Sequence, residues 1–293
     1  MDTTLERLSA RLASADRRPW LAFARRHPLL VAGACLLALM AAFSLAAPWL
    51  APYDPTDMNA LQRLKPPSAR HWFGTDALGR DVFSRTLWGG RVSLVVGISV
   101  AGLATAIGVL IGMIAGFNRW ADAIAMRFMD GMMAIPGILL AVALMTLTKA
   151  SIGTVIVAIA VPEIPRVVRL VRALVLTIRE QPYVQAAEAV GTRFHWILLR
   201  HVLPNTVTPL IVQATFICAS AVIFEAYLSF LGAGTPPEIP SWGNMMAEGR
   251  SVVQLAFGII LFPGIFLGLT VLSINLLGDG LRDMLDPRIA RRL

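Results

Sequence analysis

Residues 92–118 read VSLVVGISVAGLATAIGVLIGMIAGFN and contain no charged side chain. A helix of about 20 apolar residues crosses the hydrocarbon core of a bilayer, so this stretch is long enough to span a membrane. Gly108, Gly112 and Gly116 stand at every fourth position, and such a stripe of small residues lets two helix backbones pack closely. We therefore predict a membrane-spanning helix that packs tightly against a neighbour.

Other stretches of the chain are also long and uncharged. Four are clear, and a fifth is weaker because it contains Glu163, Pro162 and Pro165. Together with the first stretch they predict an all-α membrane protein with six transmembrane helices. The clear stretches are 29–53, 131–148, 201–224 and 251–278, and the weaker one is 150–165.

The composition of the whole chain agrees with a membrane protein. Hydrophobic residues make up 56% of its 293 residues and charged residues only 15%, and the mean hydropathy is +0.67. This is more apolar surface than a soluble core buries, which nearly excludes a soluble enzyme. The net charge of +8 alone would suggest nucleic-acid binding, but the hydropathy outweighs it, and we expect no nucleic-acid partner.

Sequence motifs for catalysis and metal binding are missing. Lys65 and Lys149 are the only lysines, and neither ends the glycine-rich Gly-Lys-Ser/Thr loop that holds nucleotide phosphates. Cys35 and Cys218 lie in long apolar stretches, and the four histidines form no pair four residues apart, as a helical metal site would need. We therefore expect a protein that is not an enzyme and that binds no metal or cofactor itself.

The distribution of basic residues predicts the orientation of the spans. Eighteen of the 26 Lys and Arg residues fall in segments 1–28, 119–130, 166–201 and 279–293. Because short cytoplasmic loops are enriched in Lys and Arg, we place these segments and both termini in the cytoplasm. The predicted parts are a cytoplasmic N-terminal segment (1–28), a first transmembrane helix (29–50), an extracytoplasmic segment (51–91), a transmembrane core of five helices (92–278) with a cytoplasmic loop (179–205), and a cytoplasmic tail (279–293).

The first span has some features of a cleaved signal peptide. Small residues from Ser44 to Ala47 follow its apolar stretch, but the 28 residues before it are too many for the start of a signal peptide. The uncharged stretch also continues past Phe43. We therefore expect a retained membrane anchor.

The loop between the fourth and fifth spans has an amphipathic pattern. It reads EQPYVQAAEAVG over residues 180–191 and continues TRFHWILLRHVLPN to Asn205. Apolar residues recur at steps of three and four, so we predict two short helices broken near Gly191. Their apolar face either lies on the membrane surface or packs under the protein's own spans, or it docks into a groove on a cytoplasmic protein.

The same loop resembles the EAA loop of the permeases of ABC importers. The resemblance rests on Tyr183-Val-Gln-Ala-Ala-x-x-x-Gly191 and on Leu203-Pro204. It implies a coupling helix, which sits in a cleft of an ATPase subunit and transmits the closure of the nucleotide-binding dimer. The first glutamate of the motif is absent, which removes a carboxylate, and His201 stands where an aliphatic residue is common. The implied coupling residues are Gln185, which replaces that glutamate, Ala186, Ala187, Glu188, Gly191, Leu203 and Pro204.

Four further segments resemble permeases of the dipeptide, oligopeptide and nickel subgroup. Together with the loop, they make the chain similar to the second, C-type permease subunit of such importers from about residue 25 onward. One departure is VPEIP at 161–165, where an aromatic-rich segment is more usual. The four segments are HWFGTDALGRDVFSR at 71–85, Met126-Arg-x-x-Asp130 with Ala134-x-Pro136, EAYLSFLG at 225–232 and PSWG at 240–243.

This resemblance implies the type I ABC importer permease fold and a place in the bacterial inner membrane. The implied function is to form half of the translocation pathway of an ATP-driven importer of dipeptides or oligopeptides. The implied partners are a second, different permease subunit, two ATP-binding subunits that use ATP and Mg, and an extracytoplasmic solute-binding protein.

Other functions stay open. Within the same subgroup, importers of nickel or a metallophore, of glutathione or of opines are alternatives. Outside it, the alternatives are a stand-alone secondary transporter or channel and a membrane anchor without transport. A secondary transporter usually shows paired halves, and six spans without a visible repeat argue against it.

Charged residues at membrane depth usually face a protein interior or water. Arg127 and Asp130 are three residues apart on a predicted helix, so we predict a structural ion pair between them. For Glu163 and Glu225 we favour a structural or interfacial role. The alternative is a place in the wall of the substrate pathway, where a carboxylate could bind a peptide amine.

The predicted extracytoplasmic segment carries charges at regular spacing. Asp76, Arg80, Asp81 and Arg85 lie four or five residues apart. We predict a short helix that begins at Thr75 or Asp76 and is held by ion pairs. The alternative role for these charges is contact with the solute-binding protein.

Overall fold

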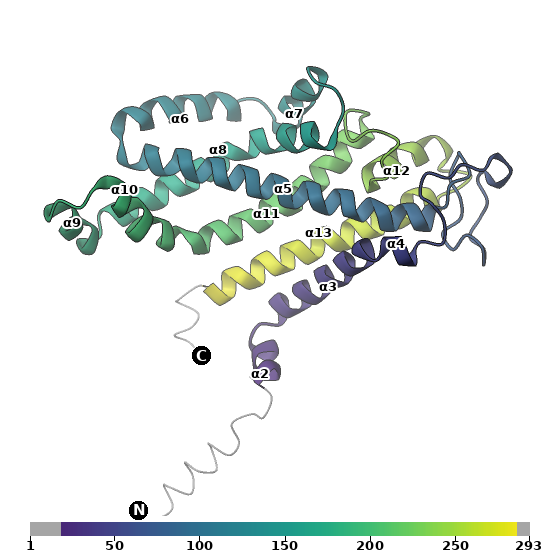
Figure 1. The fold of residues 1–293 in the computed structure, drawn as a ribbon, viewed down its shortest axis with the longest axis horizontal. Helices are drawn as coiled ribbons and strands as arrows, with labels where there is room; N and C mark the ends of the chain where they lie inside the picture. The colour runs from purple at the N-terminus through teal and green to yellow at the C-terminus, as the bar shows by residue number, and fades with distance from the viewer. Residues whose placement is uncertain (1–18, 286–293) are drawn as a thin grey trace, which may run out of the picture.

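The long helices of the chain run lengthwise in one elongated bundle (Figure 1). The computed structural model describes residues 19–285, and the parts of the predicted cytoplasmic segments that fall on 1–18 and 286–293 lie outside this range. Within residues 19–285 the only β-type pairing is an isolated bridge between Thr75 and Asp81. The helices are α2 (Pro19–Arg26), α3 (Pro28–Leu45), α4 (Ala47–Leu50), η1 (Ala60–Gln62), α5 (Val82–Phe117), α6 (Arg119–Met133), α7 (Gly137–Thr146), α8 (Ile152–Arg179), α9 (Pro182–Ala189), α10 (Phe194–Ile197), η2 (Leu198–Val202), α11 (Leu203–Phe230), α12 (Trp242–Gly249), η3 (Arg250–Val252) and α13 (Gly258–Leu285).

Four helical stretches are long and apolar enough to cross a membrane. They are α3, α5, the run Phe194–Phe230 that contains α11, and α13. α6 and α7 meet the same standard as a pair bent by 88°, which makes a fifth span if the pair counts as one. The prediction of an all-helical membrane protein is confirmed, with four or five spans by length and composition.

Several helices differ in their limits from the predicted spans. α5 begins at Val82 and not at residue 92, because the Asp81 carboxylate caps it by accepting a hydrogen bond from the Ser84 N–H at 2.7 Å. The span predicted at 131–148 is broken before Pro136, whose missing N–H interrupts a helix. The stretch predicted to end at residue 165 continues as helix α8 to Arg179.

The glycine stripe of α5 packs closely against a neighbouring helix, as the sequence predicts, and that neighbour is α8. Gly108 faces Val167, and a Cβ added to Gly112 would lie only 2.7 Å from the Cβ of Val171. Because the spacing of four residues on both helices matches one helical turn, each small residue meets one valine. The two backbones approach closely along this seam, and Val167 and Val171 are fully buried.

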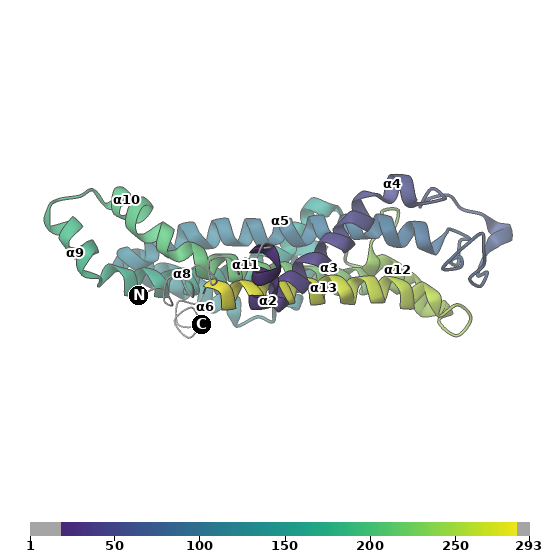
Figure 2. The same cartoon turned by 90° about the horizontal axis from the view of Figure 1, so that it is seen from below.

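The two ends of the bundle carry different structures. α9 and α10 lie at one end of the long axis, and the segment between α4 and α5 lies at the other end, beside α12 (Figure 1). Figure 2 shows the same separation from below. α5 reaches from one end to the other, so it connects both regions within a single helix.

Candidate functional site

The loop after α8 folds into two short helices that meet at a glycine. Gly191 has a backbone φ of +77°, the left-handed conformation that glycine adopts without the steric cost of a Cβ. The Gly191 and Thr192 N–H groups donate to the carbonyls of Glu188 and Ala187, which closes the end of α9. The prediction of two short helices broken near Gly191 is confirmed.

The second short helix continues into the long α11 through a π turn, η2. Pro204 stands in the first turn of α11 and has no N–H to donate. The wider turn directly before it accommodates this missing hydrogen bond. Leu203 and Pro204 therefore fix the point at which the loop ends and the long helix begins.

Apolar side chains of this region remain uncovered. Three residues anchor it, since Val184, Ile197 and Val202 are buried. Val190 is 82% exposed, and large side chains on both sides of it are about half exposed. We call this exposed set the α9–α10 face; it consists of Tyr183 (46% exposed), Val190 (82%), Phe194 (47%), Trp196 (55%) and Leu199 (57%).

The residues predicted to couple to an ATPase surround the α9–α10 face. Ala187 and Leu203 are half-buried, and the other five are exposed. The side-chain amide of Gln185 donates only to the carbonyl of Glu180, which follows the last residue of α8, at 3.4 Å. The structure thus brings these residues together at one end of the molecule. The exposed residues are Gln185, Ala186, Glu188, Gly191 and Pro204.

Contacts with the bundle hold the α9–α10 face in place. The rings of Phe194 and Phe117 meet edge to face at 5.1 Å, and the Arg179 guanidinium lies 5.7 Å from the Phe117 ring. The side-chain amide of Asn205 donates to the His201 carbonyl at 2.6 Å and to the Tyr183 hydroxyl at 3.4 Å. The face is therefore attached to the ends of α5, α8 and α11.

The predicted ion pair between Arg127 and Asp130 is wrong. Asp130 instead accepts a hydrogen bond from the Arg169 Nη2 of α8 at 2.5 Å, and Arg127 lines an apolar groove along α6. A second pair joins the same helices, since Arg172 of α8 binds both carboxylate oxygens of Asp122. Asp130 thus links two helices, whereas the three-residue spacing suggested a contact within one.

Glu163 lies in the middle of α8 with a single charged partner. Its carboxylate is 3% exposed and contacts the Arg166 Nη1 at 3.2 Å, while the Arg166 side chain is 56% exposed. The pair occupies the i and i+3 positions of the helix. The acid, Glu163, is therefore buried, and the base, Arg166, is accessible from outside the chain.

Glu225 is fully buried at the junction of three segments. Its carboxylate accepts hydrogen bonds from the hydroxyls of Ser93 on α5 at 3.2 Å, Ser229 on α11 at 2.9 Å and Thr235 after α11 at 3.5 Å. Its exposed fraction is 0%, so in this conformation it offers no surface to a substrate. The burial favours the structural role for Glu225.

The charges of the predicted extracytoplasmic segment form ion pairs, as the sequence predicts, but in a buried cluster that also includes Glu248. Asp76 binds Arg80 at 2.7 Å and Arg85 at 2.5 Å, and both arginines bind Glu248 of α12 at 2.6 and 2.7 Å. Asp76 does not begin a helix; it accepts from the Leu78 and Arg80 N–H groups of a turn. The predicted short helix is therefore wrong.

The alternative role for these charges, contact with a solute-binding protein, also needs correction. The four residues named for it, Asp76, Arg80, Asp81 and Arg85, are at most 5% exposed. Asp81 caps α5 and contacts the His71 Nδ1 at 2.9 Å. Glu248 was missed, because no regular spacing links it to charges so far away in the sequence.

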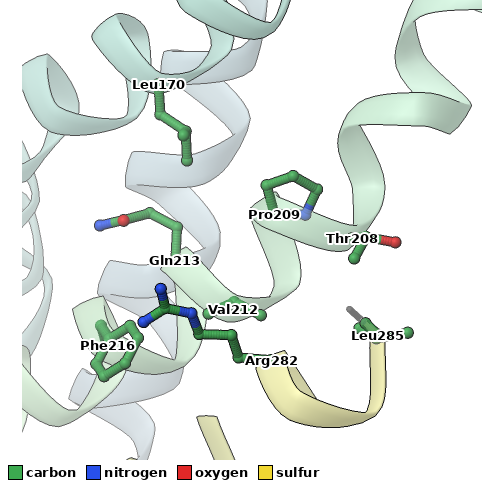
Figure 3. A pocket seen from close by; sticks show the side chains of 8 residues that line it. All are labelled: Leu170, Thr208, Pro209, Val212, Gln213, Phe216, Arg282 and Leu285. Atoms are coloured by element: carbon green, nitrogen blue, oxygen red, sulfur yellow. The ribbon is translucent and has the colours of Figure 1, made fainter. Parts of the chain in front are cut away.

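A groove opens between α8, α11 and α13 near the end that carries the α9–α10 face. Its volume is about 480 Å³. The Arg282 side chain reaches from α13 toward Gln213 and Phe216 of α11, and Leu170 of α8 closes the opposite side (Figure 3). The remaining lining is Thr208, Pro209, Val212 and Leu285, so the groove is largely apolar with one charged group.

Comparison with known proteins gives matches over most of the chain. Residues 108–291 match the family described as binding-protein-dependent transport system inner membrane component. Residues 19–67 match the N-terminal TM domain of oligopeptide transport permease C.

Individual relatives cover almost the whole chain. A probable peptide ABC transporter permease protein of Sinorhizobium fredii is 55% identical over 92% of both chains. The glutathione transport system permease protein GsiD of Pectobacterium atrosepticum is 42% identical over 93% of this chain and 91% of its own. The dipeptide transport system permease protein DppC of Alkalihalophilus pseudofirmus is 40% identical over 90% of this chain and 88% of its own.

Proposed function

Because the chain belongs to the family of binding-protein-dependent transport system inner membrane components, we propose that it forms half of the translocation pathway of an ATP-driven peptide importer. A dipeptide or oligopeptide is the proposed substrate, since relatives at 55% and 40% identity carry the names of peptide and dipeptide permeases. Glutathione is the second candidate, because a relative at 42% identity is named for it.

The α9–α10 face carries this proposal. It is a cluster of exposed apolar side chains at one end of a membrane bundle, held by packing and hydrogen bonds to three long helices. An amphipathic helix that is fixed in this way suits docking into a groove of a partner. We assign that partner as an ATPase subunit, with Gln185, Ala186, Ala187, Glu188, Gly191, Leu203 and Pro204 at or beside the contact.

The proposed arrangement has six spans, with α8 as the charged one. α8 has 28 residues, about 42 Å of helix, which is enough to cross the bilayer. α6 and α7 together form the third span despite their bend. Both termini and the α9–α10 face then lie in the cytoplasm, in agreement with the excess of arginine in those segments.

The proposed partners supply what this chain lacks. Two ATP-binding subunits hydrolyse ATP with Mg, a second permease completes the pathway, and a solute-binding protein delivers the peptide outside. ATP-bound ATPases bind one permease conformation more tightly than the other, which shifts the population between outward and inward access. The chain itself contributes half of the pathway and one docking point, and no catalytic group.

Copurification from mild detergent tests the docking proposal. Val190→Glu places a charge on the most exposed side chain of the α9–α10 face without altering the backbone. We expect wild type to bring down an ATPase and a second permease, and the variant to lose the ATPase alone. Leu61→Glu is the matched control, since Leu61 is 87% exposed at the opposite end.

The result also separates the proposal from its rival. If wild type copurifies with no ATPase, the chain is a stand-alone transporter or channel and the docking role is wrong. If Val190→Glu and Leu61→Glu both retain the ATPase and its transport coupling, the contact lies elsewhere on the chain.

A further inference from the structure

The pair Glu163–Arg166 lies at a depth where a bilayer holds no water. If α8 begins at the outer surface with Ile152, Glu163 lies about 16 Å and Arg166 about 21 Å further along the axis. Both positions fall within a hydrocarbon core of about 30 Å. Charged side chains at this depth face protein or a water-filled cavity, because lipid does not solvate them.

The side chains of Glu163 and Arg166 differ in how far they are exposed. Glu163 is 3% exposed and its charge is balanced by Arg166, whose side chain is 56% exposed. The charge that α8 offers to its surroundings here is therefore positive. A peptide amine, the group that Glu163 alone would suit, is repelled by this arrangement, and a carboxylate is attracted.

The Arg166 guanidinium has donors to spare. Among the described residues, it donates hydrogen bonds to Glu163 through Nη1 only, at 3.3 and 3.2 Å. A guanidinium has five N–H donors, and two of them on adjacent nitrogens bind a carboxylate in a bidentate manner. The Nε and Nη2 edge of Arg166 can therefore receive a carboxylate while Glu163 stays in place.

The neighbouring surface toward the α9–α10 end carries more positive charge. Leu170, one turn after Arg166, lines the groove into which Arg282 reaches beside Gln213 (Figure 3). Arg282 is the only charged residue in the lining of that groove. An anionic group that moves from Arg166 toward this groove would meet the side-chain amide of Gln213 and the guanidinium of Arg282.

We propose that Arg166, held by Glu163, binds the acidic side chains of the peptide as it passes through the inner half of the pathway. This assignment rests on the proposed transport function and names the charge that the pathway recognises. Glu163 acts as a positioning residue, which orients the guanidinium and offsets its charge so that a bound carboxylate is released again.

Uptake into proteoliposomes tests this assignment. The full complex, with the unaltered solute-binding protein, is supplied with Ala-Glu-Ala or Ala-Lys-Ala, and the ratio of their ATP-dependent uptake rates is compared with wild type. We expect Arg166→Gln to lower the ratio of acidic to basic peptide uptake about tenfold, the effect of losing one charge-assisted hydrogen bond. Arg166→Lys should give a ratio between those of wild type and Arg166→Gln, because it keeps the charge but loses the bidentate geometry.

Two control variants separate recognition from structure. Arg250→Gln removes an arginine of η3, whose guanidinium lies over Phe230, and should leave the ratio unchanged. Glu163→Gln combined with Arg166→Gln removes both charges and should keep assembly while showing the lowered ratio.

Three results would overturn the assignment. Equal loss of both peptides in Arg166→Gln would give the pair a structural role, loss of the second permease would make Arg166 an assembly contact, and an unchanged ratio would remove it from the pathway. Failure of wild type to take up either peptide with ATP would instead contradict the proposed function.

Discussion

Glu225 shows how a single buried side chain can hold several segments together. Its carboxylate accepts from three hydroxyls on α5, α11 and the loop after α11. Burying hydroxyls without a partner costs about 1–3 kcal/mol for each group. The residue therefore acts as a common acceptor that joins α5, α11 and the loop after α11.

Replacement of Glu225 should separate its packing role from any role in transport. We expect Glu225→Gln to keep uptake near the wild-type rate, since the amide oxygen still accepts hydrogen bonds. Glu225→Ala should lower the free energy of unfolding by about 3 kcal/mol, measured by thermal unfolding in detergent. Loss of uptake in a stably folded Glu225→Gln protein would instead indicate that Glu225 belongs to the wall of the substrate pathway.

Gly191 offers a second prediction at the scale of one residue. No atom lies within 4 Å of a Cβ built on it, so only its φ of +77° resists substitution. Gly191→Asn should therefore keep ATPase copurification, because asparagine tolerates this conformation, whereas Gly191→Val should cost about 1–2 kcal/mol and weaken it. Equal behaviour of the two variants in the copurification assay would show that backbone conformation is not the constraint.

Among the elements, α5 and α8 depend on each other most directly. Their seam predicts that Gly112→Ala is destabilising by about 1–3 kcal/mol, because the new methyl group would overlap Val171. Gly102→Ala is the matched control in the same helix, since no atom lies within 4 Å of a Cβ there, and alanine favours a helix. In thermal unfolding, Gly112→Ala should lower the unfolding temperature and Gly102→Ala should raise it. Equal loss of stability in the two variants would contradict the close packing of α5 against α8.

The helices were largely predictable from the sequence, and the contacts between them were not. Uncharged length located α3, α11 and α13, and the four-residue glycine repeat indicated that α5 packs closely against a neighbour, without indicating that the neighbour is α8. The start of α5 was missed because its first turns carry Arg85 and Arg91, which a search for uncharged stretches excludes. Asp130 was paired with Arg127 because sequence spacing reveals only partners within one helix.

The candidate site divides in the same way. The break at Gly191 follows from local sequence and was predicted. The exposure of Val190 and the burial of Glu225 depend on how distant helices pack, so no local pattern reports them. Arg80 and Arg85 link Asp76 to Glu248 of α12, which is far away in the chain, and a single sequence does not reveal this contact.

At the scale of the whole molecule, the two ends should lie on opposite sides of the membrane. Single cysteines at Leu61 and Val190, both strongly exposed, test this after Cys35 and Cys218 are replaced by serine. A membrane-impermeant thiol reagent added to spheroplasts should label Leu61→Cys, and Val190→Cys should react only after the membrane is opened. The reverse pattern would invert the proposed orientation.

α5 has a mechanical consequence for the whole protein. Its 36 residues make a rod of about 54 Å, nearly twice the thickness of the bilayer core. Its N-terminal end lies in the Asp76–Arg85–Glu248 cluster, and Phe117 at its C-terminal end packs against Phe194 of α10. A continuous helix resists compression, so a force applied at α10 is transmitted along the length of α5. We therefore expect α5 to act as a strut that transmits a force on α10 to the loops around the Asp76–Arg85–Glu248 cluster.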